Sequence, residues 1–247
     1  MKKFSEIPMR TWNWLGVNEV STEVESEEKN FIVNANESKK ISEVNLSKNS
    51  SAKKIHVTVE ENANIDLIVV DLSENDSFNE IIVDLNGDNS KANITAAYFC
   101  FGDNKLDLNY IINQRGKKTD ATMDVKGALN GHCDKIFRGT LNFEKGTKGS
   151  IGREKEEVIV LSDEVRNRSV PLMLSHEDEV DGHHAVSIGR IDEEKLFYLM
   201  SRGLDKIESE KLIVEAAFNP VINLLDDEEL IKKISEVIER RLIDVEK

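Results

Sequence analysis

Three short segments carry the side chains best suited to bind metal or sulfur. The first is the pair His183-His184, in a strand-like stretch. Imidazole is a common metal ligand, but neighbouring residues of a strand point to opposite faces, so only one of the two should reach a given site. The second is His132-Cys133, where an imidazole beside a thiol can favour the thiolate and bind a soft metal. The third is the acidic run 154–157, which we interpret as a solvated strand edge.

Each segment also has a purely structural interpretation. A lone histidine pair is more often structural or surface-exposed than a ligand, and Cys133 suits a small buried side chain. The spacing motifs of common enzymes are missing from the sequence. Residues 146–152 are glycine-rich but do not end in the Lys-Ser/Thr of a phosphate-binding loop, and neither a nucleophile elbow nor a zinc-binding pair occurs. We therefore do not expect a nucleotide-binding, hydrolase or zinc enzyme.

Composition narrows the choice further. The 247 residues carry a formal net charge of −14, which argues against a nucleic-acid partner because phosphate binding needs clustered Lys and Arg. Two cysteines are too few for a disulfide framework and suit a reducing cytoplasm. No apolar run approaches the ~20 residues of a membrane span, and the N-terminus has no signal-peptide pattern. We expect a cytoplasmic protein without a membrane partner.

The elements that position these residues are mostly short strands. Several alternate apolar and polar residues, as a half-buried strand does. The candidate strands are 41–46, 55–59, 65–70, 80–85, 92–99, 107–112, 121–125, 137–143, 158–161, 172–175 and 184–188. Four asparagines, at 36, 49, 62 and 75, are 13 residues apart. Asparagine tolerates left-handed corners, so this period favours stacked coils, although an antiparallel sandwich also has short strands at regular spacing.

The pattern changes to a helical period after residue 190. A first helix should start at Asp192 and end at Gly203, a second should run from 206 to 218 and end or kink at Pro220, and a third should start at Asp226. The sequence thus predicts an N-terminal extension and linker (1–30), a β core (31–190) and a small helical domain (191–247). Trp12 and Trp14, in the extension, are expected to dock it onto its own domain.

Taken together, five segments resemble the SufB/SufD family of iron–sulfur cluster assembly scaffolds. They are Phe-Arg-Gly-Thr-Leu at 137–141, Val-Leu-Ser-Asp-Glu at 160–164, Val-Pro-Leu-Met-Leu at 170–174, His-His-Ala at 183–185, and Leu-Phe-Tyr-Leu-Met-Ser-Arg-Gly at 196–203. The resemblance implies a mainly β protein, a right-handed parallel β-helix followed by a C-terminal helical domain. It also implies partners: a SufC-like ABC ATPase on the helices, and a SufB-like subunit or a second copy of this chain on the β-helix.

The resemblance assigns roles to particular residues. His184 matches the histidine that SufD proteins use in building the nascent cluster, which also makes it the candidate metal ligand, and His183 precedes it. The sulfur-accepting cysteine of SufB aligns near Glu156, and glutamate cannot carry a persulfide. The cysteine that SufD proteins carry two residues before the histidine is replaced by Gly182. With these departures the chain resembles SufD more than SufB. Cys133 is a weaker candidate for the cluster site. The expected ATPase-docking residues are Asp192, Leu196, Tyr198, Arg202 and Gly203.

The leading hypothesis is a non-catalytic SufD-like scaffold that holds an iron–sulfur cluster transiently at a subunit interface and binds no nucleotide itself. A β-helix carbohydrate-active enzyme and a purely structural solenoid are the alternatives. The helices could also cap the open end of the β-helix. We expect the aromatic rings of Phe197 and Tyr198 to lie in the core rather than at an interface.

Overall fold

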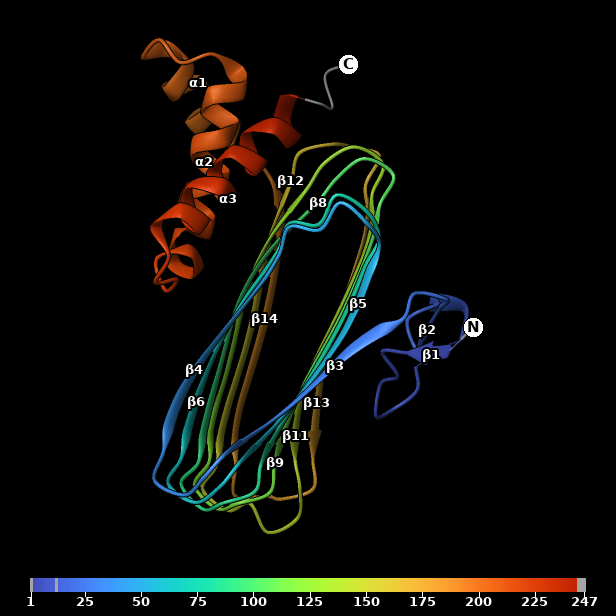
Figure 1. The fold of residues 1–247 in the computed structure, drawn as a ribbon, viewed down its shortest axis with the longest axis vertical. Coiled ribbons are helices and arrows are strands. Elements are labelled where there is room, and N and C mark those ends of the chain that lie inside the picture. Colours follow the sequence, from blue (N-terminus) through green and yellow to red (C-terminus); the bar gives the residue numbers. More distant parts are fainter. Residues whose placement is uncertain (1, 12, 244–247) are drawn as a thin grey trace.

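The chain winds into a parallel β-helix with a separate group of helices beside it (Figure 1). This computed structural model describes residues 2–11 and 13–243. Twelve strands form two six-stranded sheets, ordered β14-β12-β10-β8-β6-β4 and β13-β11-β9-β7-β5-β3, and every pair within them is parallel. Each coil contributes one strand to each sheet. The predicted parallel β-helix is therefore confirmed, and an antiparallel sandwich is excluded.

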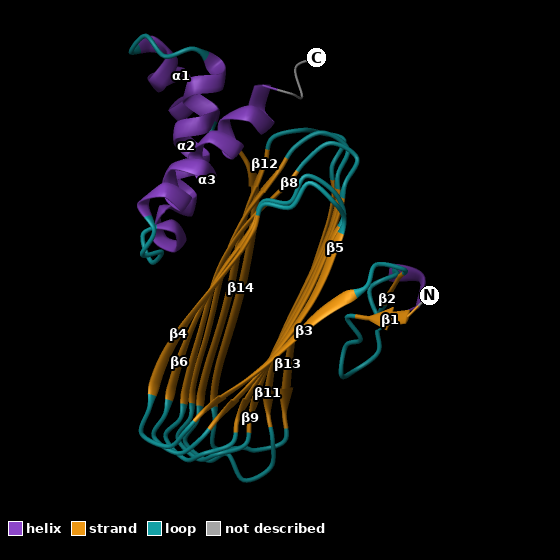
Figure 2. Cartoon of the chain, viewed as in Figure 1, coloured by secondary structure: helices purple, strands orange, loops and turns teal. Residues whose placement is uncertain are grey.

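The bounds of the coil strands are as follows. The first sheet contains β4 (Ser38–Asn45), β6 (Asn64–Asp71), β8 (Lys91–Cys100), β10 (Asp120–Leu129), β12 (Ile151–Val160) and β14 (Asp181–Arg190). The second contains β3 (Ser26–Val33), β5 (Ser51–Val59), β7 (Ser77–Leu85), β9 (Lys105–Gln114), β11 (Asp134–Phe143) and β13 (Arg166–Ser175). Figure 2 shows the two sheets joined by short turns.

Asparagine corners set the period of the coils. Asn36, Asn62 and Asn89 all have positive φ, and each stands at the turn before a strand of the first sheet. Their amides form a ladder in which Asn62 donates to Asn36 and Asn89 donates to Asn62, over sequence separations of 26 and 27 residues. The first coils are thus about twice the 13-residue spacing seen in the sequence, and the later ones are longer, with Lys91 opposite Asp120 and Asp120 opposite Ile151 in the register. The other two asparagines of the 13-residue series, Asn49 and Asn75, lie at the opposite turn of their coils. There the Asn75 side chain donates to the Lys48 carbonyl.

The space between the two sheets is filled by one apolar core. Alternate residues of each strand point into it, among them Ile55, Ile94 and Leu108, which are at most 1% exposed. In-register parallel pairing stacks like residues on successive coils, so the same alternation repeats along the axis.

Three helices follow the last coil, namely α1 (Glu193–Ser201), α2 (Lys206–Ile222) and α3 (Glu228–Ile243). Two of them, α2 and α3, cover the outer face of the first sheet instead of closing its end, while α1 packs on α2. A second apolar cluster joins Val214, Phe218 and Ile238 of the helices to outward residues of β6, β8 and β10, including Ile68 and Phe99. The expectation that the helices cap the last coil is wrong, because this outward apolar row gives them a better apolar surface.

The buried Arg241 fastens α3 to the sheet. Its guanidinium donates to the backbone carbonyls of Phe99, Leu72 and Ser73, and its side chain is fully buried. Two details of the helices differ from expectation. The second helix continues two residues past Pro220, and Asp227 rather than Asp226 caps the third, with its carboxylate accepting from the Leu230 amide.

The N-terminal segment lies against the second sheet, on the flank opposite the helices (Figure 1). It contains β1 (Lys2–Phe4), a 3-10 turn (Asn13–Leu15) and β2 (Val20–Thr22), with β1 and β2 antiparallel. Phe4 packs edge-on against Phe78 of β7. Trp14 is 80% exposed, so it does not dock the segment, and Trp12 lies outside the described residues. Strand β3 begins at Ser26, within the segment expected to be linker.

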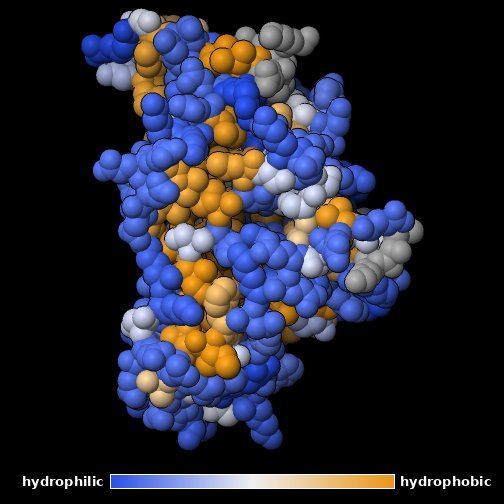
Figure 3. All heavy atoms as spheres, in the orientation of Figure 1, coloured by the Kyte–Doolittle hydropathy of each residue, from blue (hydrophilic) through white to orange (hydrophobic). Residues whose placement is uncertain are grey.

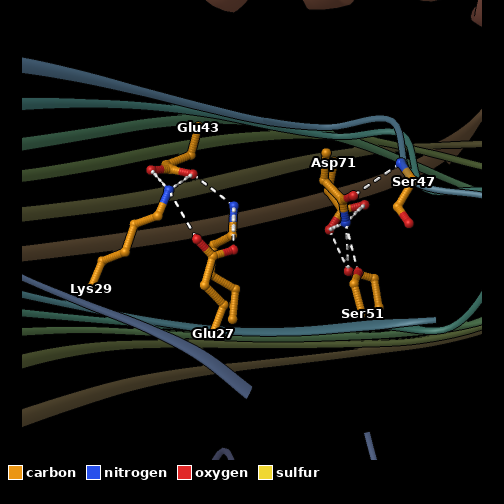
Figure 4. A network of polar contacts seen from close by, with 9 residues as sticks. Glu27, Lys29, Glu43, Ser47, Ser51 and Asp71 are labelled. Atoms are coloured by element: carbon orange, nitrogen blue, oxygen red, sulfur yellow. Dashed lines mark hydrogen bonds and ion pairs between the residues drawn. The ribbon is translucent and has the colours of Figure 1, made fainter. Parts of the chain in front are cut away.

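The first coil closes much of its own end with polar contacts. The Glu43 carboxylate accepts from the ammonium groups of Lys29 and Lys53, each at 2.7 Å, and deeper inside, Asp71 accepts from Ser77 at 2.6 Å (Figure 4). On the same face, apolar side chains gather along the middle between hydrophilic borders (Figure 3).

Within the described residues, no helix is long and apolar enough to cross a membrane.

Candidate functional site

The last coil is the open end of the β-helix. Among the described residues, β14 pairs only with β12 and β13 only with β11, so each leaves one backbone edge unpaired there. Every residue of β14 is exposed, including the aliphatic Val186 and Ile188 at 38% and 51%. An unpaired, ten-residue strand edge with exposed aliphatic side chains is a ready template for another chain. The predicted pair His183-His184 lies on this strand.

The two histidines point to opposite sides of β14. Gly182 stands on the inward row, because a Cβ there would lie 2.5 Å from the sulfur of Met173. His184, two residues on, shares that row, whereas His183 points outward and pairs with Asp181 at 2.9 Å. Within the described part of the chain, His184 makes no hydrogen bond or ion pair. Its imidazole therefore sits free over the mouth of the core.

A buried polar cluster lies directly below this mouth. The Lys135 ammonium pairs with the Glu156 carboxylate, and both side chains are 0% exposed. Lys135 also donates to Asn167 at 2.9 Å and to Ser169 at 3.0 Å, both on the last coil. Tyr98 donates its hydroxyl to Glu156 at 2.7 Å. Burial lowers the pKa of Lys135 and raises that of Tyr98 well above its usual range.

Glu154 is the exception in this cluster. It is only 3% exposed, and neither carboxylate oxygen has a hydrogen-bond partner among the described residues. The carboxylate reaches across the core to Gly139 of β11, where a Cβ would lie 2.0 Å from its Oε1. Burial, with the nearby Glu156 charge as a second cause, raises the pKa of Glu154 to about 8. The absence of a side chain at Gly139 thus makes room for an unpaired buried acid.

Our interpretation of residues 154–157 as a solvated edge is wrong for two of the four. Strand β12 begins at Ile151, so Glu154 and Glu156 share the inward row with Val158, while Lys155 and Glu157 remain outside. The sequence did carry an indication of this burial, because every second position back from Val158 belongs to the same face of the strand, and these positions include Glu156 and Glu154. It was missed because inward-facing glutamates are rare unless they are paired.

Cys133 lies in the turn before β11, one coil below the open end, where its carbonyl accepts from the Arg166 amide of the last coil. It is fully buried, and its thiol donates to the Cys100 carbonyl at 3.4 Å. A hydrogen bond between the two thiols lowers the pKa of Cys133 and raises that of Cys100. The neighbouring His132 instead points outward to Asp103 and Glu164. The described residues contain no group of three or more His, Cys, Asp or Glu side chains placed to hold a metal ion.

The predicted docking residues gather around α1. Asp192 caps the helix by accepting from the Glu194 and Lys195 amides, and Gly203 follows it with φ of 100°. A hollow of about 610 Å³ between α1 and α2 is lined by Asp192, Tyr198 and Leu212. The expectation that Phe197 and Tyr198 belong to the core is wrong, since they are 74% and 56% exposed. With the sheet already covered by α2 and α3, α1 has no core to face.

Of the other two predicted docking residues, Arg202 stacks over the Tyr198 ring, with its guanidinium carbon 5.1 Å from the ring centroid. Leu196 is half-buried on the same helix. The five residues therefore share one exposed end of the helical group.

Comparison with known proteins identifies the family. Residues 22–217 match the family model described as "SUF system FeS cluster assembly, SufBD core domain". The chain belongs to this SufBD core family. The match covers the β-helix and continues into α2, so the open end and the α1–α2 hollow both lie within the family domain.

Named relatives agree with this assignment. The chain is 35% identical over 127 residues to the iron–sulfur cluster assembly protein SufD of Bacillus subtilis, covering 51% of this chain and 29% of that protein. It is 30% identical over 154 residues to an iron–sulfur cluster assembly SufBD family protein of Pyrococcus horikoshii, covering 62% and 34%. A SufBD family protein of Mycobacterium leprae is 26% identical over 164 residues, covering 63% and 42%. The matched region is thus less than half the length of these relatives.

Proposed function

We propose that this chain is a SufD-like, non-catalytic scaffold subunit that assembles iron–sulfur clusters in the cytoplasm. The observation that carries the proposal is the position of His184, on the inward row of an unpaired edge strand at the mouth of the core. A nascent cluster is the cargo of such a site. A single imidazole cannot hold one, so the remaining ligands must come from elsewhere in this chain or from a partner.

We expect the partner at this end to be a second scaffold subunit, either SufB-like or another copy of this chain. Its own edge strand would pair with β14 and cover Val186 and Ile188. This arrangement would place His184 at the junction of two subunits. It would also cover the apolar side chains that the last coil leaves exposed.

We place a SufC-like ABC ATPase on the α1–α2 hollow. Tyr198 of α1 and Leu212 of α2 line this hollow and are large and exposed, and α1 is not needed to cover the sheet. Aromatic side chains in a hollow are frequent anchors of protein interfaces. The nucleotide would then be bound by the ATPase rather than by this chain.

The experiment is reconstitution with both partners from the same organism. Complex formation is measured by light scattering, and cluster formation by visible absorption with iron and a sulfur donor. We expect His184→Ala to form the complex with normal stoichiometry and to yield less cluster. An unchanged cluster yield would remove His184 from the site.

A second pair of variants tests the edge. Val186→Lys with Ile188→Lys should abolish scaffold pairing, because charge on an edge strand opposes its extension. The control is Ile32→Lys on β3, since Ile32 is an aliphatic residue that is even more exposed (63%) but lies on the first coil. Equal pairing in both variants would argue against β14 as the interface.

A carbohydrate-active enzyme finds less support. Glycoside cleavage needs two carboxylates flanking an open substrate groove. The acids Glu154 and Glu156 share one strand face but lie inside the core, where a polysaccharide has no room.

A further inference from the structure

Glu154 is the most anomalous buried group among the described residues. A carboxylate that is removed from water without hydrogen-bond partners is strongly destabilising, so such groups normally find a cation or donor. Here both oxygens remain unpartnered, whereas Glu156, two residues on in the same row, is paired with Lys135. Gly139 leaves the space that the carboxylate occupies. The residue is held in place by packing rather than by polar contacts.

The register of the last two strands of the first sheet places Glu154 beside His184. The two residues are direct partners in the β12–β14 ladder, and both belong to the inward row. Adjacent strands are about 4.8 Å apart, so two long side chains on paired positions of one face can reach a common ion. The neighbouring pair on this row, Glu156 with Val186, cannot do the same because valine has no ligand atom and Glu156 is already paired with Lys135.

The charge of the cluster is also unbalanced. It contains two carboxylates, Glu154 and Glu156, and one ammonium, Lys135. One negative charge therefore has no counter-charge when both acids are ionised. A divalent cation at the mouth would supply it, and carboxylate with imidazole is a ligand combination suited to Fe²⁺ and its neighbours in the first transition row.

We propose that Glu154 is a second metal ligand of this chain, and that it binds a divalent transition-metal ion together with His184. The inference rests on the proposed role of His184 and extends it from one ligand to two. Water or a subunit seated on the last coil completes the coordination. The chain would then hold the iron of a nascent cluster before sulfur arrives.

The test uses Co²⁺ as a spectroscopic probe on the purified full chain. Binding is followed by ligand-field absorption and by titration calorimetry. We expect the wild-type chain to bind Co²⁺, and Glu154→Gln and His184→Ala each to lower the affinity at least about tenfold, which corresponds to about 1.4 kcal/mol. Circular dichroism and thermal unfolding verify that each variant is folded.

The matched controls come from the outward rows of the same two strands. Glu157→Gln on β12 and His183→Ala on β14 should leave Co²⁺ affinity unchanged. Absence of Co²⁺ binding by the folded wild type, or equal affinity in folded Glu154→Gln, would overturn the proposal. Loss of binding with Glu154→Ala but not with Glu154→Gln would also contradict it, because it would indicate a packing effect.

These outcomes are separable from failure of the proposed function. Co²⁺ binding needs only this chain, whereas the scaffold role needs complex formation with the ATPase and a second scaffold. A chain that binds Co²⁺ through Glu154 but forms no complex would refute the scaffold role alone. A chain that forms the complex but binds Co²⁺ identically with Gln at position 154 would refute the ligand assignment alone.

Discussion

Lys135 and Glu156 form an ion pair that joins the two sheets entirely inside the β-helix, with both side chains at 0% exposure. Lys135 comes from β11 and Glu156 from β12, so the pair spans the core one coil below its open end. Taking two charges out of water is expensive, and the extra hydrogen bonds from Tyr98 and to Asn167 offset part of that cost.

We predict that Lys135→Met destabilises the chain by about 3–5 kcal/mol, because it leaves Glu156 charged and unpaired in the core. Urea unfolding measures the effect. The double variant Lys135→Met with Glu156→Leu should regain most of the loss. Lys148→Met, which breaks the exposed pair with Glu179, is the control and should leave the stability close to that of the wild type. Equal losses in the single and double variants would show that packing rather than charge dominates.

Arg241→Met should loosen the helical group from the sheet. It removes the donors to three buried carbonyls, for an expected loss of about 3 kcal/mol or more. Hydrogen exchange should show faster exchange of the α2 and α3 amides while the β-helix strands stay protected. Arg240→Met, which breaks only the surface contact with Glu74, should behave as wild type. Uniform loss of protection across the chain would contradict a local role.

The pH dependence of stability should carry the signature of Glu154. Its pKa is about 8 in the folded chain against 4.5 as its ordinary value, so the folded state binds more protons between these values. The free energy of unfolding therefore falls as pH rises through this window, by up to ~1.4 kcal/mol per pH unit from this group, and levels off above it.

The check compares Glu154→Gln with wild type by urea unfolding, without metal, at about pH 6 and about pH 9. The variant should gain stability relative to wild type as pH rises. Glu157→Gln, on the outward row, should show no such gain over this range. A constant difference between Glu154→Gln and wild type would mean that the carboxyl is not protonated in the folded chain.

The α1–α2 hollow should bind the ATPase through apolar contact. We predict that Leu212→Glu reduces ATPase affinity by about tenfold or more without changing the unfolding free energy, because Leu212 is 46% exposed. Leu224→Glu is the matched control, since Leu224 is similarly exposed at 40% but does not line the hollow. Isothermal calorimetry with the purified ATPase measures both. Equal weakening by the two substitutions would indicate a non-specific charge effect.

The sequence by itself determined the type and order of the elements. Strand alternation, asparagine corners and the late change to a helical period together predicted a solenoid followed by three helices, because these are local properties of backbone conformation and side-chain burial. Asparagines at 36 and 62 marked real corners, although the first coil proved to be two spacings long and later coils are longer still. The resemblance to scaffold proteins also pointed to the family that the comparison established.

Only the tertiary structure decided which face each residue occupies and what covers it. The register between β12 and β14 brings Glu154 and His184 together across 30 positions of the chain, and no local pattern encodes that juxtaposition. The helices settled on the side of the first sheet because outward apolar residues such as Phe99 lie there, far along the chain. Burial of Glu154 and exposure of Phe197 follow from these long-range contacts, which depend on how coils stack and not on any residue's own preference.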